Sequence, residues 1–113
     1  MKIEVRFRGI QASDALRDHV ARRVHFQLSR FNGGVSSVVV RIGDINGPKG
    51  GADKRCHVTV RGPTISPVMI DDLSGDAYSA IDMALERAAR TVGRELERLR
   101  ASRRPDGAVG RAS

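Results

Sequence analysis

The sequence is poor in the residues on which several kinds of site depend. It has one cysteine, Cys56, and no tryptophan, and it has only three phenylalanines and one tyrosine. A single cysteine excludes an intramolecular disulfide and a cysteine-based zinc cluster, and it suits a reducing compartment. The aromatic residues are too few and too scattered to form a platform on which nucleic-acid bases stack. They are Phe7, Phe26, Phe31 and Tyr78.

The sequence also lacks a long hydrophobic run. No segment approaches the roughly 18 consecutive apolar residues of a membrane-spanning helix. Residues 1–6 alternate apolar and charged side chains where a signal peptide would have an apolar block, so we expect a cytoplasmic protein. The 113 residues suit one domain. We place this domain at 1–101 and expect a disordered basic tail at 102–113, which shows no apolar periodicity.

Motifs that would indicate an enzyme or a bound ion are absent or incomplete. The glycine-rich segment 46–53 does not end in Gly-Lys-Ser or Gly-Lys-Thr, so it is no Walker phosphate loop. Asp44 and Asn46 match the opening of a calcium loop, but Arg55 occupies the twelfth position, where a bidentate glutamate is required. Cys56 and His57 are adjacent on a predicted strand and would point to opposite faces. We expect no catalysis, no metal and no cofactor.

An acidic cluster precedes the last predicted helix. Asp71, Asp72 and Asp76 lie within six positions of one another, and a carboxylate pair for acid-base chemistry is one interpretation. Carboxylates before a helix more often accept hydrogen bonds from its first backbone N–H groups. We therefore favour helix capping for this cluster.

The pattern of apolar residues predicts an α+β fold. Alternation predicts strands over 2–8, 37–42 and 55–61, and a short or edge strand at 68–70, where Pro67 cannot donate to a ladder. Ser13 can cap a helix with apolar residues at spacings of three or four, and a second helix is predicted over 76–100. The order β-α-β-β-β-α predicts a two-layer α/β sandwich, with a four-stranded sheet and two helices on one face.

The second predicted helix separates apolar from basic residues. At about 100° per residue, one stripe holds Tyr78, Ile81, Leu85, Ala88, Ala89, Val92, Leu96 and Leu99 and should face the core. Opposite it, four arginines project outward along one line: Arg87, Arg90, Arg94 and Arg98. Like charges at such spacings repel one another. A polyanionic partner would explain the row, and a solvated, salt-bridged helix surface remains the alternative.

The overall charge agrees with a polyanion-binding surface. Twenty Lys and Arg against thirteen Asp and Glu give a formal charge of +7 and a pI near 11.0. The first predicted helix adds Arg17, Arg22 and Arg23, although Asp14 and Asp18 dilute its first turns. Lys49 lies in the glycine-rich segment, and Lys54 and Arg55 follow it. The glycines of this segment could let the backbone approach a phosphate closely, or the segment could be an ordinary hairpin connection.

The last predicted helix opens with Asp76, Tyr78, Ala80 and Ile81 in the pattern Asp-x-Tyr-x-Ala-Ile, followed by Arg87, Arg90 and Arg94. With the element order, this resembles the ribosome hibernation-promoting factor and ribosome-associated inhibitor family over residues 2–100. The first helix is similar through residues 15–17, 19–20 and 23. The glycine-rich segment is longer than in the family. We expect a short form of the family, without the separate C-terminal dimerisation domain of its long members.

The resemblance implies a function. It implies binding in the channel of the small ribosomal subunit where messenger and transfer RNA sit, which would block translation in stressed cells. The arginines of the last helix would be the principal phosphate contacts, supported by those of the first helix. Two alternatives stay open from the residues alone. One is a general double-stranded RNA or DNA binder, and the other is a protein-interaction module whose charge meets an acidic partner.

Overall fold

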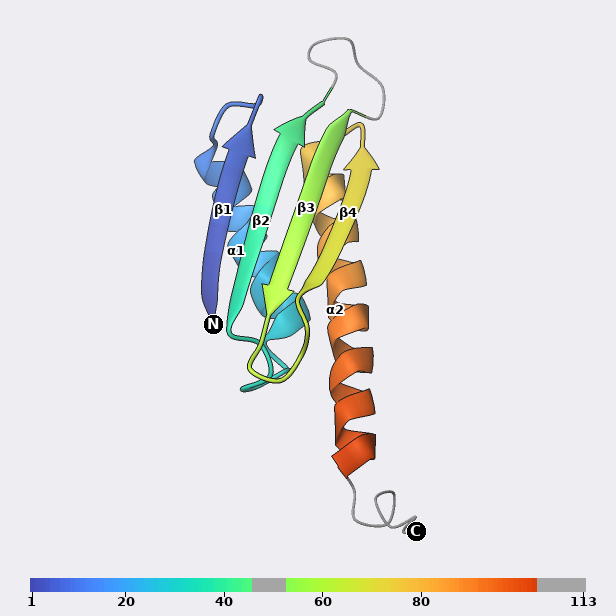
Figure 1. Ribbon diagram of the computed structural model, residues 1–113. Coiled ribbons are helices and arrows are strands. Elements are labelled where there is room, and N and C mark those ends of the chain that lie inside the picture. The colour runs from blue at the N-terminus through green and yellow to red at the C-terminus, as the bar shows by residue number, and fades with distance from the viewer. Residues whose placement is uncertain (46–52, 104–113) are drawn as a thin grey trace.

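A computed structural model of the protein describes residues 1–45 and 53–103, and it confirms the predicted β-α-β-β-β-α order (Figure 1). The strands and helices follow one another as β1 (Lys2–Arg8), α1 (Asp14–Leu28), β2 (Ser37–Asp44), β3 (Lys54–Arg61), β4 (Val68–Ser74) and α2 (Ala77–Arg103). The strands form one sheet in the order β1-β2-β3-β4, in which β1 and β2 are parallel and the other neighbours antiparallel. Within the described residues, no helix is both long and apolar enough to cross a membrane.

Both helices lie on the same side of the sheet, as the sequence predicts (Figure 1). The residues of β2 and β3 that point toward them are fully buried, whereas the next residues along each strand are more exposed. Helix α2 packs on β3 and β4 and also contacts α1, which lies over the β1 side. The opposite face of the sheet has no layer of the described chain upon it.

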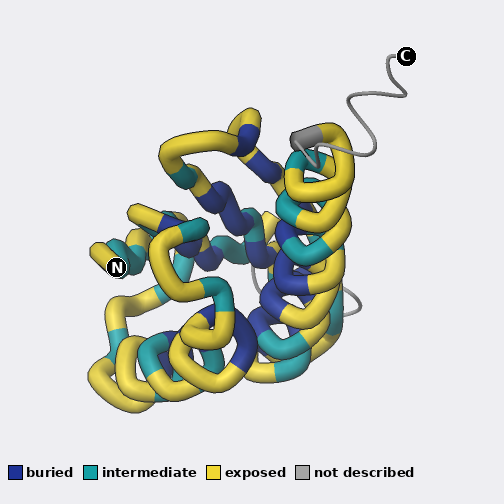
Figure 2. The backbone as a smooth tube through the Cα atoms, turned by 90° about the horizontal axis from the view of Figure 1, so that it is seen from below, coloured by how far each residue is buried: buried dark blue, intermediate teal, exposed yellow. Residues whose placement is uncertain are grey.

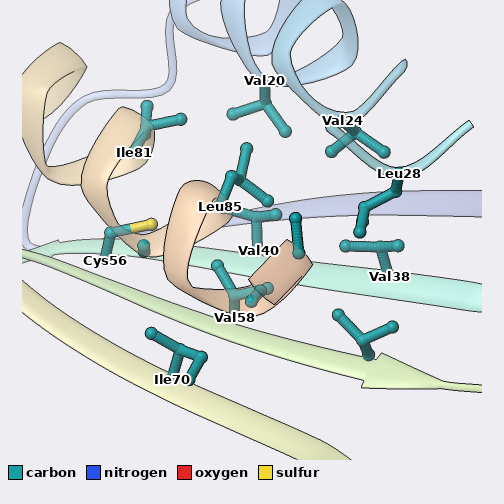
Figure 3. Packing of buried hydrophobic residues seen from close by; sticks show 14 of the residues in the cluster. Val20, Val24, Leu28, Val38, Val40, Cys56, Val58, Ile70, Ile81 and Leu85 are labelled. Carbon is teal, nitrogen blue, oxygen red and sulfur yellow. The ribbon is translucent and has the colours of Figure 1, made fainter. Parts of the chain in front are cut away.

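The core lies between the helices and the sheet (Figure 3). Val20, Val24 and Leu28 of α1 point toward Val38 and Val40 of β2, and each of them is at most 1% exposed. Ile81 and Leu85 of α2 complete the layer over Cys56, Val58 and Ile70. Buried residues follow one side of α2 along most of its length (Figure 2). Apolar burial of this kind is the main stabilising contribution to the fold.

Local sequence sets the ends of the helices. The Ser13 hydroxyl accepts a hydrogen bond from the Leu16 N–H at 3.2 Å, as a capping residue should. At the start of α2, the Asp76 carboxylate accepts from the Ser79 N–H at 3.2 Å. Gly33, after α1, has a φ of +78°, a conformation that L side chains rarely adopt. These contacts confirm the predicted caps at Ser13 and Asp76.

Three expectations from the sequence need correction. Strand β4 continues to Ser74, so Asp71 and Asp72 are strand residues and do not cap α2. Tyr78, assigned above to the core stripe, is 39% exposed and sits edge-on to the His19 ring at 4.9 Å. Helix α2 continues to Arg103, so residues 102 and 103 are helical, and the rest of the proposed tail lies outside the described residues.

Candidate nucleic-acid interface

The arginines of the α2 row project from the outer side of the helix, and all four are exposed. Most of them are paired with a carboxylate. Arg90 Nη1 lies 3.1 Å from Glu86 Oε1, one helical turn away, and Arg98 pairs with Glu95. Arg94 makes no ion pair within the described residues, and its one hydrogen bond is to the Thr91 hydroxyl at 3.4 Å. Exposed ion pairs of this kind contribute little to stability and exchange partners readily, so a phosphate can compete for them.

Arg87 differs from the rest of the row because it binds another element. Its Nη1 donates to Asp72 Oδ1 at 2.7 Å and to the Asp71 carbonyl oxygen at 3.2 Å, both on β4. The Asp72 side chain is only 13% exposed, so this pair is screened less than the others. The row therefore turns toward the β4 edge of the sheet at Arg87.

The α1 arginines occupy three different environments. Arg22 is exposed and forms no ion pair in the described part of the chain. Arg17 is also exposed and places its guanidinium carbon 5.0 Å from the centre of the Phe7 ring. Arg23 is half-buried, 3.4 Å from Asp82 of α2 and 4.9 Å from the ring of Phe26. The position of Arg23 joins the two helices and leaves its guanidinium less free than those of Arg17 and Arg22.

The structure does not bring the two sets of helix arginines into one continuous row. Asp82, which contacts α1, and Arg87, which contacts β4, are five positions apart and therefore about 140° apart around α2. His19 Nε2 also meets Asp82 Oδ1, at 2.7 Å, between the helices. The basic surface of α1 and the α2 row thus flank a helix junction that carries a carboxylate.

Two of the basic residues predicted to bind phosphate near the β2–β3 connection, Lys54 and Arg55, pair with carboxylates. Lys54 Nζ lies 3.0 Å from Asp53 and 3.3 Å from Asp44, and the hydrogen bond to Asp53 raises the pKa of the Lys54 amine, with Asp44 adding to it. Arg55 donates to the Asp71 carboxylate from Nε at 2.8 Å and from Nη2, and this hydrogen bonding raises the pKa of the guanidinium. Lys49 lies outside the described residues.

Sequence reasoning missed two features of the surface. Phe26 is 71% exposed on α1 beside Arg23, and the helical spacing of 22, 23, 26 and 30 was the available signal. The open face of the sheet carries Arg8 and Arg41, which no single-strand pattern connects. Within residues 1–45 and 53–103, no group of three or more His, Cys, Asp or Glu side chains is arranged to hold a metal ion.

The fold and its surface define a class of protein: a small α+β sandwich with an exposed basic helix row. The chain belongs to the sigma 54 modulation protein / S30EA ribosomal protein family, whose model matches residues 3–100. Comparison with curated protein sequences gives no significant match.

Two solved structures are similar to the chain. The Protein Y N-terminal domain of Thermus thermophilus has a TM-score of 0.68 at 25% identity, covering 83% of this chain and 98% of that one. A ribosomal subunit interface protein from Coxiella burnetii has a TM-score of 0.70 at 19% identity, covering 86% of this chain and 99% of that one. At that identity, the second likeness concerns the fold alone. The family identified from the sequence is confirmed.

Proposed function

We propose that this protein binds the small ribosomal subunit through its basic helix faces and blocks translation by occupying the messenger and transfer RNA sites. The protein would act in the cytoplasm by occupancy, without catalysing a reaction. One observation carries the proposal: a chain of the S30EA ribosomal protein family presents an exposed arginine row on α2.

The proposed contacts are ranked by how free each guanidinium is. Arg94 has no carboxylate partner in the described chain, so binding a phosphate there breaks no ion pair. Arg90 and Arg98 must exchange an exposed carboxylate for a phosphate, which costs little in water. Arg17 and Arg22 supply free charge from α1. Guanidinium groups suit this task because they form bidentate contacts with phosphate oxygens.

The shape and chemistry of such a surface support steric inhibition as the proposed mode of action. Phosphate contacts position a protein on RNA without reading its sequence, and the described surface offers no stacking platform for bases. A rigid sandwich held on ribosomal RNA by its helices would exclude other ligands from the volume it fills. Binding should therefore be strongly salt-dependent, since each phosphate neutralised releases counterions.

The test is cosedimentation with purified small subunits at increasing salt. Arg94→Glu and the double variant Arg90→Glu/Arg94→Glu are compared with the wild-type protein. We expect about tenfold weaker binding for Arg94→Glu and a larger loss for the double variant, with a flatter salt dependence. Arg87 is left intact in these variants, because reversing its charge would place two carboxylates together at Asp72.

Arg100→Glu is the matched control. It makes the same charge change on α2, about 120° around the helix from Arg94, and its side chain is exposed and paired only with Glu97. Equal losses for Arg94→Glu and Arg100→Glu would mean that net charge alone drives binding, and the proposed site would be wrong. Equal wild-type affinity for naked duplex RNA and for intact subunits would favour a general double-stranded nucleic-acid binder.

A further inference from the structure

The face of the sheet that points away from the helices carries a second group of positive charges. Because side chains alternate along a strand, the residues between the buried ones all point to this side. The parallel and antiparallel registers place Arg6 beside Arg41, and Arg41 beside His57. The cationic side chains of this face, named here the open-face cluster, are Lys2, Arg6, Arg8, Arg41, Arg55 and Arg61.

Two carboxylates on the open face neutralise only part of this cluster. Glu4 pairs with Arg6, and the hydrogen bond from Arg6 lowers the pKa of Glu4. Asp71 pairs with Arg55, and the hydrogen bond from Arg55 lowers the pKa of Asp71. Both acids are therefore ionised at neutral pH. The remaining members of the cluster form no salt bridge within residues 1–45 and 53–103. These members are Lys2, Arg8, Arg41 and Arg61.

The cluster surrounds a hollow in the sheet surface. Gly43 stands between Arg8 on β1 and Arg55 on β3 in the register, and it has no side chain to fill the space. A Cβ at this position would lie 3.1 Å from the Arg8 carbonyl oxygen, which is tighter than ordinary contact. The hollow is lined by Arg6, Arg41 and His57 and also by Asp44, whose carboxylate pairs with Lys54. Guanidinium groups thus surround a patch of bare backbone on several sides.

Placing these cations side by side costs stability, which the pairs made by Glu4 and Asp71 recover only in part. Like charges directly opposite each other on neighbouring strands are destabilising, and Arg6 and Arg41 are such neighbours. A bound anion removes the repulsion and adds charge-assisted hydrogen bonds.

The chemistry of the face favours RNA over a protein as its occupant. Protein interfaces depend on a few large anchors, chiefly Trp, Tyr and Arg, in packed pockets. The described open face carries no tryptophan, tyrosine or phenylalanine, since Phe7 points to the core side of β1. Its exposed apolar residues, Met69 and Leu73, lie together on the edge strand β4. Between them and β1, the strands β2 and β3 present the guanidinium groups of Arg41, Arg55 and Arg61, which suit phosphates, beside Val39 and Thr59.

We propose that the open face of the sheet binds a second segment of RNA phosphate backbone, with Arg8 and Arg41 as its main contacts beside the Gly43 hollow. This inference rests on the proposed function, because the RNA is that of the small subunit. The protein then lies between two RNA segments, one on the helices and one on the sheet. Binding through both faces is tighter than binding through either face alone, because once one face is bound the other meets its RNA segment at a high effective concentration.

The test compares Arg8→Glu/Arg41→Glu with wild type in cosedimentation with small subunits. Loss of two phosphate contacts should lower the slope of log affinity against log salt by about 1.5, and weaken binding at least tenfold. Arg100→Glu serves again as control. Wild-type binding together with an unchanged slope for the open-face variant overturns this inference alone. Failure of wild type to bind overturns both it and the proposed function.

A second measurement covers the case in which the double variant fails to fold, as judged by circular dichroism. A photoreactive diazirine amino acid replaces Met69, which is 61% exposed on the open face. After irradiation of the complex with small subunits, we expect an adduct that ribonuclease degrades. An adduct to ribosomal protein alone, or no adduct at all, contradicts the proposal.

Discussion

Arg87 of α2 donates a hydrogen bond to Asp72 of β4 across 2.7 Å, and this pair fastens the arginine row to the edge of the sheet. The second carboxylate oxygen of Asp72 is buried and has no hydrogen-bond partner. The negative charge of Asp72 is therefore compensated mainly by Arg87. The Arg87 side chain is about half exposed, so another anion can also reach it. The same guanidinium serves the fold and is available for the proposed interface.

Replacing Asp72 with asparagine should separate these two roles. Asp72→Asn removes the charge that competes with phosphate for Arg87, so we expect severalfold tighter binding to small subunits. We also expect the free energy of unfolding to fall by about 1–2 kcal/mol, because a charge-assisted hydrogen bond is weakened. Asp18→Asn makes the same charge change on an exposed position of α1. An equal gain in affinity for that control would show that net charge, and not Arg87, is responsible.

The pairing of Asp71 with Arg55 predicts how stability depends on pH. Because Arg55 lowers the pKa of Asp71 in the folded state, the contribution is fully present above the unfolded value near 3.8 and is lost as pH falls through the lower folded value. Asp71→Asn should flatten the dependence of the denaturation midpoint on pH in this acidic range. Parallel curves for the variant and wild type would contradict the assignment. Since Asp71 is exposed, we expect a modest effect.

Cys56 should resist modification while the protein is folded. Its side chain is fully buried beneath α2, and burial raises the pKa of the thiol to about 12, with Asp72 and Asp71 adding to the shift. The thiolate is the reactive form, so iodoacetamide at pH 8 should leave the native protein unlabelled and add one group after denaturation. Mass spectrometry measures both. Rapid labelling of the native protein would show that Cys56 is accessible, against the burial described here.

Gly62 should tolerate no side chain. A Cβ there would collide with the carbonyl group of Gly34, where the loop after β3 crosses the segment that leads into β2. Since backbone atoms on both sides must move, we expect Gly62→Ala to lower the free energy of unfolding by about 2 kcal/mol or more. Thr64→Ala in the same loop, at an exposed position, should change it by less than about 0.5 kcal/mol. Urea denaturation compares the two variants. Equal midpoints would show that the backbone segments of Gly62 and Gly34 can move apart at little cost.

The sequence predicted the fold because its periodic segments are long and clear. The spacing of Leu16, Val20 and Val24 on α1 continues into a single buried stripe. The edge position predicted for strand β4 is confirmed. Its length was underestimated because Asp71 and Asp72 were assigned to helix capping, and only pairing with β3 shows that they continue the ladder. Tyr78 lies within the α2 stripe but in the first turn of the helix, and a helical wheel does not show that this end of the stripe leaves the core and meets His19.

The arginine row could be predicted in position but not in its pairing. Helical spacing indicates the partners Glu86 and Glu95, which are three or four residues away. The Arg87–Asp72 contact spans 15 positions and exists only because α2 packs across β4. The open-face cluster was missed for a similar reason, because single strands show isolated arginines and only the register brings Arg6, Arg41 and His57 together.

Helix α2 is longer than the sheet that supports it. Its 27 residues span about 40 Å, whereas strands of seven or eight residues span about 26 Å. The last turns therefore run past the sheet (Figure 1), with Leu96 and Leu99 only half-covered. Amide hydrogens in this overhang should exchange with deuterium well before those near Leu85. A partner that binds the last turns of α2 should slow amide hydrogen exchange there. Exchange rates in these turns therefore report whether that end of the helix is bound.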